Sequence, residues 1–119
     1  MKILNMGLSK SKYAQNIPVT VDGFFYEFVE DLEAVHTMES AAERQLFKVM
    51  KSKGIKKKGI KAWLNPNYLK YSNVQINLYI TGYTSMLVSV LNVCFSYGMQ
   101  VICYHYNRKT GNFFPQKVY

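Results

Sequence analysis

The chain has 119 residues and a net charge of +8, and 49% of its residues are hydrophobic and 15% aromatic. A chain so rich in apolar residues gains too much by burying them to stay disordered, so we expect one folded domain. No segment approaches the ~20 apolar residues of a membrane-spanning helix. The N-terminus also lacks the apolar stretch of about 7 to 15 residues that a signal peptide needs, so we expect a cytoplasmic protein.

The acidic side chains are confined to one short stretch. All seven lie between Asp22 and Glu43, and the residues after Glu43 include ten Lys and two Arg. Positive charge without acidic neighbours favours binding of phosphates or of an acidic surface. Acid/base catalysis by paired carboxylates, and magnesium held by carboxylates, cannot be built from the C-terminal part alone. The charge distribution therefore favours an anion-binding protein over a hydrolase.

The cysteines and histidines do not predict a metal site. Cys94, Cys103, His36 and His105 show none of the spacings typical of zinc ligands. Both cysteines lie in apolar runs, where a reduced Cys behaves as a small hydrophobic residue. We therefore expect no metal and no cofactor.

The N-terminal part predicts strands followed by a helix. Residues 2–7 form a short strand, and residues 17–21 (IPVTV) form a second one, with Pro18 favouring an edge position. Residues 23–36 fit both a strand and a helical stripe, and we favour an extended entry that passes into a helical turn.

A helix is predicted from about residue 39 to residue 53. Ser40 and Glu43 have the spacing of a capping box, and Gly54 is a typical residue to follow a helix end. The lysine-rich run 51–61 comes next. Such a run is usually a solvated loop, although it is also able to follow a nucleic-acid backbone.

The C-terminal part predicts a βαβ crossover and a hairpin. Residues 75–81 form a strand, 85–97 a helix ended by a glycine, 99–107 a second strand, and 112–119 an edge strand. We therefore expect an α+β fold with an α/β-like C-terminal half. It consists of a small mixed sheet with a single layer of two main helices, and it is oligomeric. One domain spans residues 1–119, with strands and helix over about 1–62 and the βαβ unit plus hairpin over about 74–119.

The turn Thr81–Thr84 joins a predicted strand to a predicted helix. Free backbone N–H groups and the helix dipole attract anions at such a turn. A single Gly82 is much weaker than a three-glycine nucleotide fingerprint, and many strand-to-helix turns bind nothing. A phosphate site here is one of two open interpretations.

The predicted helix 85–97 carries no charged residue. Its polar residues Ser85, Ser89, Asn92 and Ser96 form one stripe. A helix facing water normally carries charges, so this one predicts cover on most sides, most economically by a second subunit. The stripe would hydrogen-bond a ligand or a symmetry mate, or serve only for close packing within a buried helix.

Arg108 and Lys109 follow the last strand of the βαβ unit. Arg binds phosphate through two parallel hydrogen bonds and also stacks on rings, whereas the alternative is an exposed charge at a hairpin end. His105 and Cys103 point to one face of the same strand. We interpret both of these as structural, because a Cys/His catalytic pair also needs exposure and an orienting third group.

The segment LYITGYTSMLVSVLNVCFSYGMQVICYHYNRKTGNFFPQ resembles the phage Thoeris anti-defence proteins of the first type. The resemblance covers about residues 74–116. It implies a sponge that binds cyclic ADP-ribose isomers made by immune TIR enzymes, or related cyclic nucleotides, and does not cleave them. It also implies a homo-oligomer built on dimers, located in the host cell cytoplasm if phage-encoded.

The resemblance implies a nucleotide pocket near the subunit boundary. In the family such a pocket is lined by an aromatic ring, an Asn on the last helix and an Arg after it, and these match Tyr83, Asn92 and Arg108. We add Thr84 and Lys109 as neighbouring ligand-binding residues. Tyr83 departs from the family if its ring there is a Phe, which leaves stacking possible and the ligand preference open.

Three other functions stay open at this point. A ring nuclease that degrades cyclic oligoadenylate would use His105 and Lys109. A basic nucleic-acid-binding module would use the lysine-rich run, although the common motifs of such modules are missing. An interaction protein would dock its basic face on an acidic partner. Our first hypothesis remains a nucleotide sponge without enzymatic activity, membrane contact or nucleic acid as its partner.

Overall fold

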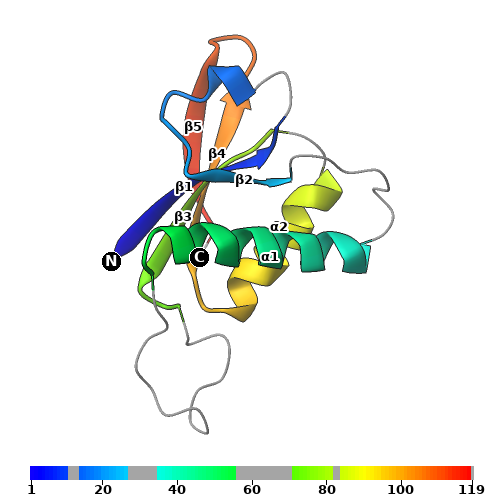
Figure 1. Ribbon diagram of the computed structural model, residues 1–119. Coiled ribbons are helices and arrows are strands. Elements are labelled where there is room, and N and C mark those ends of the chain that lie inside the picture. The colour runs from blue at the N-terminus through cyan, green and yellow to red at the C-terminus, as the bar shows by residue number, and fades with distance from the viewer. Residues whose placement is uncertain (11–13, 27–34, 56–70, 82–83, 119) are drawn as a thin grey trace, which may run out of the picture.

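The computed structural model describes residues 1–10, 14–26, 35–55, 71–81 and 84–118. They form one five-stranded sheet, two α-helices and a short 3-10 helix (Figure 1). In chain order the elements are β1 (Lys2–Ser9), η1 (Ala14–Asn16), β2 (Gly23–Tyr26), α1 (Val35–Ser52), β3 (Val74–Tyr79), α2 (Thr84–Ser96), β4 (Gln100–Asn107) and β5 (Asn112–Lys117).

The sheet has the strand order β2-β1-β3-β4-β5. The pairs β1–β2, β1–β3 and β3–β4 are parallel, and β4–β5 is an antiparallel hairpin. The predicted fold, a small mixed sheet with two main helices, is confirmed. So is the β3–α2–β4 crossover, whose parallel strands require a long connection such as a helix. Because β1 pairs with β3, the N-terminal and C-terminal parts of the chain share one sheet.

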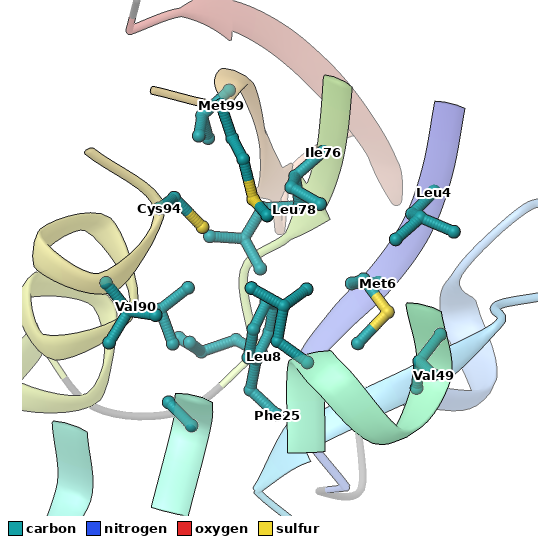
Figure 2. Packing of buried hydrophobic residues seen from close by; sticks show 14 of the residues in the cluster. Leu4, Met6, Leu8, Phe25, Val49, Ile76, Leu78, Val90, Cys94 and Met99 are labelled. Atoms are coloured by element: carbon teal, nitrogen blue, oxygen red, sulfur yellow. The ribbon is translucent and has the colours of Figure 1, made fainter. Parts of the chain in front are cut away.

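The core lies between the sheet and the helices. Alternate residues of β1, β3 and β4 point to the helices, and the strand register aligns Leu4 with Ile76 and Ile76 with Val101. Helices α1 and α2 pack against each other over this face, where they contribute Leu46 and Val90. Figure 2 shows buried side chains of β1 and β3, such as Leu8 and Leu78, meeting Val90 and Cys94 of α2 in this core. Neither described helix is long and apolar enough to cross a membrane.

Both helices end in the same glycine-based motif. The amide of Gly54 donates to Lys51 O (3.1 Å) and that of Ile55 to Met50 O (3.0 Å). Gly98 and Met99 repeat this pattern at the end of α2. Both glycines have positive φ, 68° and 70°, which only glycine adopts without steric cost, so both predicted helix ends are confirmed.

The start of α1 differs from the prediction. The helix begins at Val35, so Ser40 lies within its second turn and the capping-box interpretation was wrong. Pattern alone could not separate a helix start from a helix interior here, because the preceding segment also carries a helical stripe. Residues 27–34, which include part of the ambiguous segment, lie outside the described residues, as do 56–70 and 82–83.

The second strand was also predicted in the wrong place. Residues 17–21 form no strand, and β2 begins instead at Gly23 and pairs in parallel with β1. Close packing explains this choice, because a Cβ on Gly23 would lie 2.8 Å from Val49 Cγ2, and the ring of Phe24 lies directly over Gly7. These glycines let the short strand approach both α1 and β1.

Candidate functional site

The strand order reverses at one point along the carboxyl edge of the sheet. From β1 the chain continues to β2 on one side, and it later returns to β3 on the other side. In open α/β sheets, ligands bind outside the carboxyl ends of the strands at the point where the order reverses in this way. Here that point lies between the ends of β1 and β3, at Ser9 and Thr81.

Ser9 and Thr81 are joined by three hydrogen bonds. The Ser9 amide donates to Thr81 Oγ1 (3.2 Å), and Thr81 Oγ1 donates to Ser9 O (2.6 Å). The Ser9 hydroxyl in turn donates to Thr81 O. Both residues are buried. Because each hydroxyl already has its partners, these two side chains fix the ends of the two strands and do not themselves offer free groups to a ligand.

Helix α2 begins at this edge, at the exposed Thr84. The first amides of an α-helix have no partner within the helix and carry partial positive charge, so they attract anions. The predicted ligand residue Thr84 therefore lies where a phosphate would meet the helix. Tyr83, the predicted stacking ring, lies outside the described residues.

The β4–β5 hairpin extends beyond this edge. Pairing of β3 with β4 ends at Tyr79 and Tyr104, whereas pairing of β4 with β5 continues to Asn107 and Asn112. In Figure 1 the orange and red strands accordingly reach past the ends of the others. Arg108, the next residue in the chain, is thus at the tip of a projecting hairpin.

The turn of this hairpin holds both predicted cations. Arg108 and Lys109 are exposed. The turn is held by Asn107, which accepts bonds from Lys109 N at its side chain (2.9 Å) and from Gly111 N at its carbonyl (2.8 Å). Gly111 has φ 75°, as such a turn requires. The cations are therefore presented on an ordered backbone.

Aromatic rings line both faces of the hairpin, an arrangement that was not predicted from the sequence. On the face away from the helices, Tyr79 stacks on Tyr104 (4.6 Å between centroids, 13° between planes), and Phe113 packs against Tyr79 and Tyr106. Burial raises the pKa of Tyr79. The alternation of aromatic residues along 104–106 was the available signal.

Asn92 does not adjoin the carboxyl edge within one chain. It lies eight residues beyond Thr84, about 12 Å along the helix axis. Its Nδ2 donates to Glu39 Oε1 of α1 (3.0 Å), and one turn further on the Tyr97 hydroxyl donates to Glu43. Asn92 therefore belongs to the contact between α1 and α2 and lies apart from Thr84.

Two serine side chains of the polar stripe on α2 donate hydrogen bonds to backbone carbonyls of the same helix. Ser89 is buried and donates to Ser85 O (2.9 Å), and Ser96 donates to Val93 O (2.7 Å). The exposed positions of α2 include Val88 (49% exposed) and Phe95 (66% exposed). The exposed side of this uncharged helix thus carries Val88 and Phe95 beside the polar Asn92 and Ser96.

The described cysteines are poor candidates for chemistry. Burial raises the pKa of Cys94 to about 12 and also raises the pKa of Cys103. A thiol that stays protonated is a weak nucleophile and a weak metal ligand. Among the described residues, no group of three or more His, Cys, Asp and Glu side chains is close enough to hold a metal ion.

No protein-family model, curated protein or solved structure matches this chain. Its function is therefore inferred from its own residues. The most informative of them are at the carboxyl edge, where the start of α2, the Ser9–Thr81 junction and the basic hairpin come from separate parts of the sequence.

Proposed function

We propose that this protein binds and sequesters a cyclic ADP-ribose or related cyclic nucleotide immune messenger without cleaving it, as the Thoeris anti-defence resemblance implies. One observation carries the proposal: the strand order reverses beside the first turn of α2, at the carboxyl ends of the parallel strands β1 and β3. That is the position where sheets of this kind bind phosphate-bearing ligands.

The charges near this edge support an anionic ligand. The elements β3, α2, β4 and β5 all follow Glu43 and contribute no acidic side chain. In our proposal the helix start at Thr84 receives one phosphate, and Arg108 with Lys109 neutralises the remaining charge. Tyr83 stacks on the base or ribose, the role that the resemblance assigns to it.

Asn92 enters the proposal through a second copy of the chain. The exposed apolar residues Val88 and Phe95 flank it on α2, and α2 carries no charge that would oppose close contact between two copies. A dimer formed through this face would bury them. A pocket at the subunit boundary would then combine Asn92 of one protomer with the carboxyl edge of its partner.

The proposal is tested by releasing the bound ligand. A nanomolar site, worth about 12 kcal/mol, is sufficient for sequestration. The protein is incubated with a cyclic ADP-ribose isomer, freed of unbound ligand and denatured by heat, and the supernatant is analysed by mass spectrometry. We expect recovery of the intact ligand in proportion to the protein. Recovery of a linear or hydrolysed product, or of no ligand, would contradict the proposal.

A ring nuclease is the second candidate, because of the position of His105. The Ile80 amide donates to Tyr104 O (3.0 Å), so the next residue of β4, His105, lies beside the end of β3. His105 is half-buried, and Lys109 follows on the same hairpin. The release experiment with cyclic oligoadenylate separates the two functions, since a nuclease returns linear products.

Nucleic-acid binding through the lysine-rich run has less support. Only residues 51–55 of that run are described, and the ammonium group of Lys53 forms an ion pair with Asp22 (3.0 Å). A cation that already faces a carboxylate adds little to phosphate binding. This candidate predicts an affinity that falls steeply with salt and does not depend on Asn92.

A further inference from the structure

Phe114 is a large aromatic residue exposed on the edge strand β5. Nearly half of its surface, 49%, is exposed to solvent. Its ring lies beside that of His105, with 5.3 Å between the centroids and 31° between the planes. The preceding residue, Phe113, has its ring against Tyr79 and Tyr106 on the opposite face. Packing within the chain therefore accounts for Phe113 and leaves Phe114 half exposed.

The ring pair lies next to the candidate site. His105 pairs with Phe114 across the hairpin, and it is on the same face of β4 as the buried Cys103, which is the face that α2 covers. The Ile80 amide bonds to the residue before His105, so the end of β3 is immediately alongside. The pair thus extends the carboxyl edge outward from β3.

The imidazole of this pair is held in place. His105 Nε2 lies 2.8 Å from Gln116 Oε1, a hydrogen bond that restrains the orientation of the ring. The His105 ring is therefore already ordered beside Phe114 before a ligand binds. Stacking a third, flat ring on this pair would then cost little side-chain entropy.

The surrounding charge favours a nucleotide as that ligand. Arg108 and Lys109 are on the turn of the same hairpin, and the hairpin contains no acidic residue. A purine base joined to phosphate combines a flat ring with negative charge, which matches an exposed aromatic ring on the same hairpin as two cations.

We infer that Phe114 and His105 form a stacking shelf for the purine ring of the nucleotide held at the carboxyl edge. The inference rests on the proposed function and adds a base-recognition surface to it. The ligand must then carry a base, because the helix start and the basic turn alone recognise only phosphate. Pyrophosphate would bind at the same edge but much more weakly.

The shelf is tested by calorimetry with a cyclic ADP-ribose isomer and with inorganic pyrophosphate. Loss of aromatic stacking costs on the order of tenfold in affinity per base. We expect Phe114→Leu to weaken binding of the cyclic nucleotide about tenfold or more, and Phe114→Trp to retain it. Neither substitution should change the weaker pyrophosphate affinity or the melting temperature.

Ile3→Ala is the matched control, because Ile3 is an apolar residue of similar exposure (53%) that lies near the amino end of β1, away from the hairpin. It should leave nucleotide affinity within about twofold of the wild type, the change expected where no base is stacked. Equal binding by the wild type and Phe114→Leu would overturn the shelf while leaving the proposed function intact. If the wild type binds no cyclic nucleotide, the proposed function fails and the shelf fails with it.

Discussion

Polar groups are bonded differently at the two ends of the parallel strands β1 and β3. Towards the amino end, Gln75 donates to Asn77 (2.9 Å) and Asn77 donates to Asn5 (3.1 Å). The Asp22 carboxylate accepts from the Asn5 amide (2.9 Å) and pairs with Lys53 (3.0 Å). Amides and charges there satisfy one another within the chain.

At the carboxyl end, two buried hydroxyl groups are matched in this way, and the cations of the hairpin turn are exposed. Ser9 and Thr81 bond to each other, while Thr84 at the start of α2 and Arg108 and Lys109 at the tip of the projecting hairpin are exposed. In our proposal, the polar residues at the amino end stabilise the fold and those at the carboxyl end bind a ligand. Substitutions should therefore affect stability at one end and binding at the other.

The largest effect is expected in the core that supports both ends. Leu78 is fully buried in the central strand β3, and Leu78→Ala should lower the free energy of unfolding by about 2–5 kcal/mol. Urea denaturation measures the loss. Lys48→Ala on the exposed side of α1 is the control, expected within about 0.5 kcal/mol of the wild type. Similar stabilities for the two variants would contradict the packing described above.

Arg108→Ala should separate binding from stability. Losing a charged hydrogen-bonding partner costs about 1.5–3 kcal/mol, or roughly ten- to a hundredfold in nucleotide affinity, measured by calorimetry. The chain offers a matched control in Arg44, its only other arginine, which is exposed on α1. Arg44→Ala should bind normally. If both variants bind equally well, Arg108 is not a ligand residue.

Asp22→Ala should show the opposite pattern. It leaves the Asn5 amide without its carboxylate partner and removes the ion pair to Lys53, which we expect to cost about 1–3 kcal/mol of stability. Nucleotide affinity should not change. A loss of affinity at unchanged melting temperature would show that the amino end also contributes to binding.

The smallest effect concerns alkaline pH. Burial is the main cause that raises the pKa of Tyr26 from 10.0 to about 12, and burial also raises the pKa of Cys94 from 9.0 to about 12. Both groups ionise more readily in the unfolded chain. Their stabilising contribution is therefore complete below about pH 9 and is lost as the pH rises towards about 12.

Thermal unfolding between pH 8 and pH 11 measures this loss. The Tyr26 hydroxyl donates to Met38 O (3.0 Å), so Tyr26→Phe should cost about 1 kcal/mol at neutral pH. It should also flatten the alkaline decline, because one titrating group is gone. An equally steep decline in the variant would exclude Tyr26 as a cause.

Local pattern predicted the C-terminal elements well. Strands β3, β4 and β5 and helix α2 each carry a complete signal of their own, such as the glycine at 98 or the proline at 115. The position of β2 could not be predicted in the same way. It depends on contacts of Gly23 and Phe24 with distant partners, and the more strand-like sequence 17–21 is not the one that pairs.

The candidate site was only partly predictable for the same reason. Thr84, Arg108 and Lys109 were proposed as ligand residues from their places after strands, and their role stays a prediction. The bonds between Ser9 and Thr81 join residues 72 positions apart, which no local pattern predicts. Similarly, the stacking of Tyr79 on Tyr104 follows from strand register. Asn92 was grouped with these residues, yet it lies two helical turns away from Thr84 in the same chain.

The central claim is that a nucleotide binds at the carboxyl edge of the sheet, and NMR titration of the labelled protein with a cyclic ADP-ribose isomer tests it most directly. We predict that the amide signals of Ser9, Thr81, Thr84 and Arg108 shift in a saturable way. The amides of Lys2, Val74 and Gln100 at the amino edge should stay in place. Shifts confined to the amino edge, or no shifts at ligand excess, would contradict the claim.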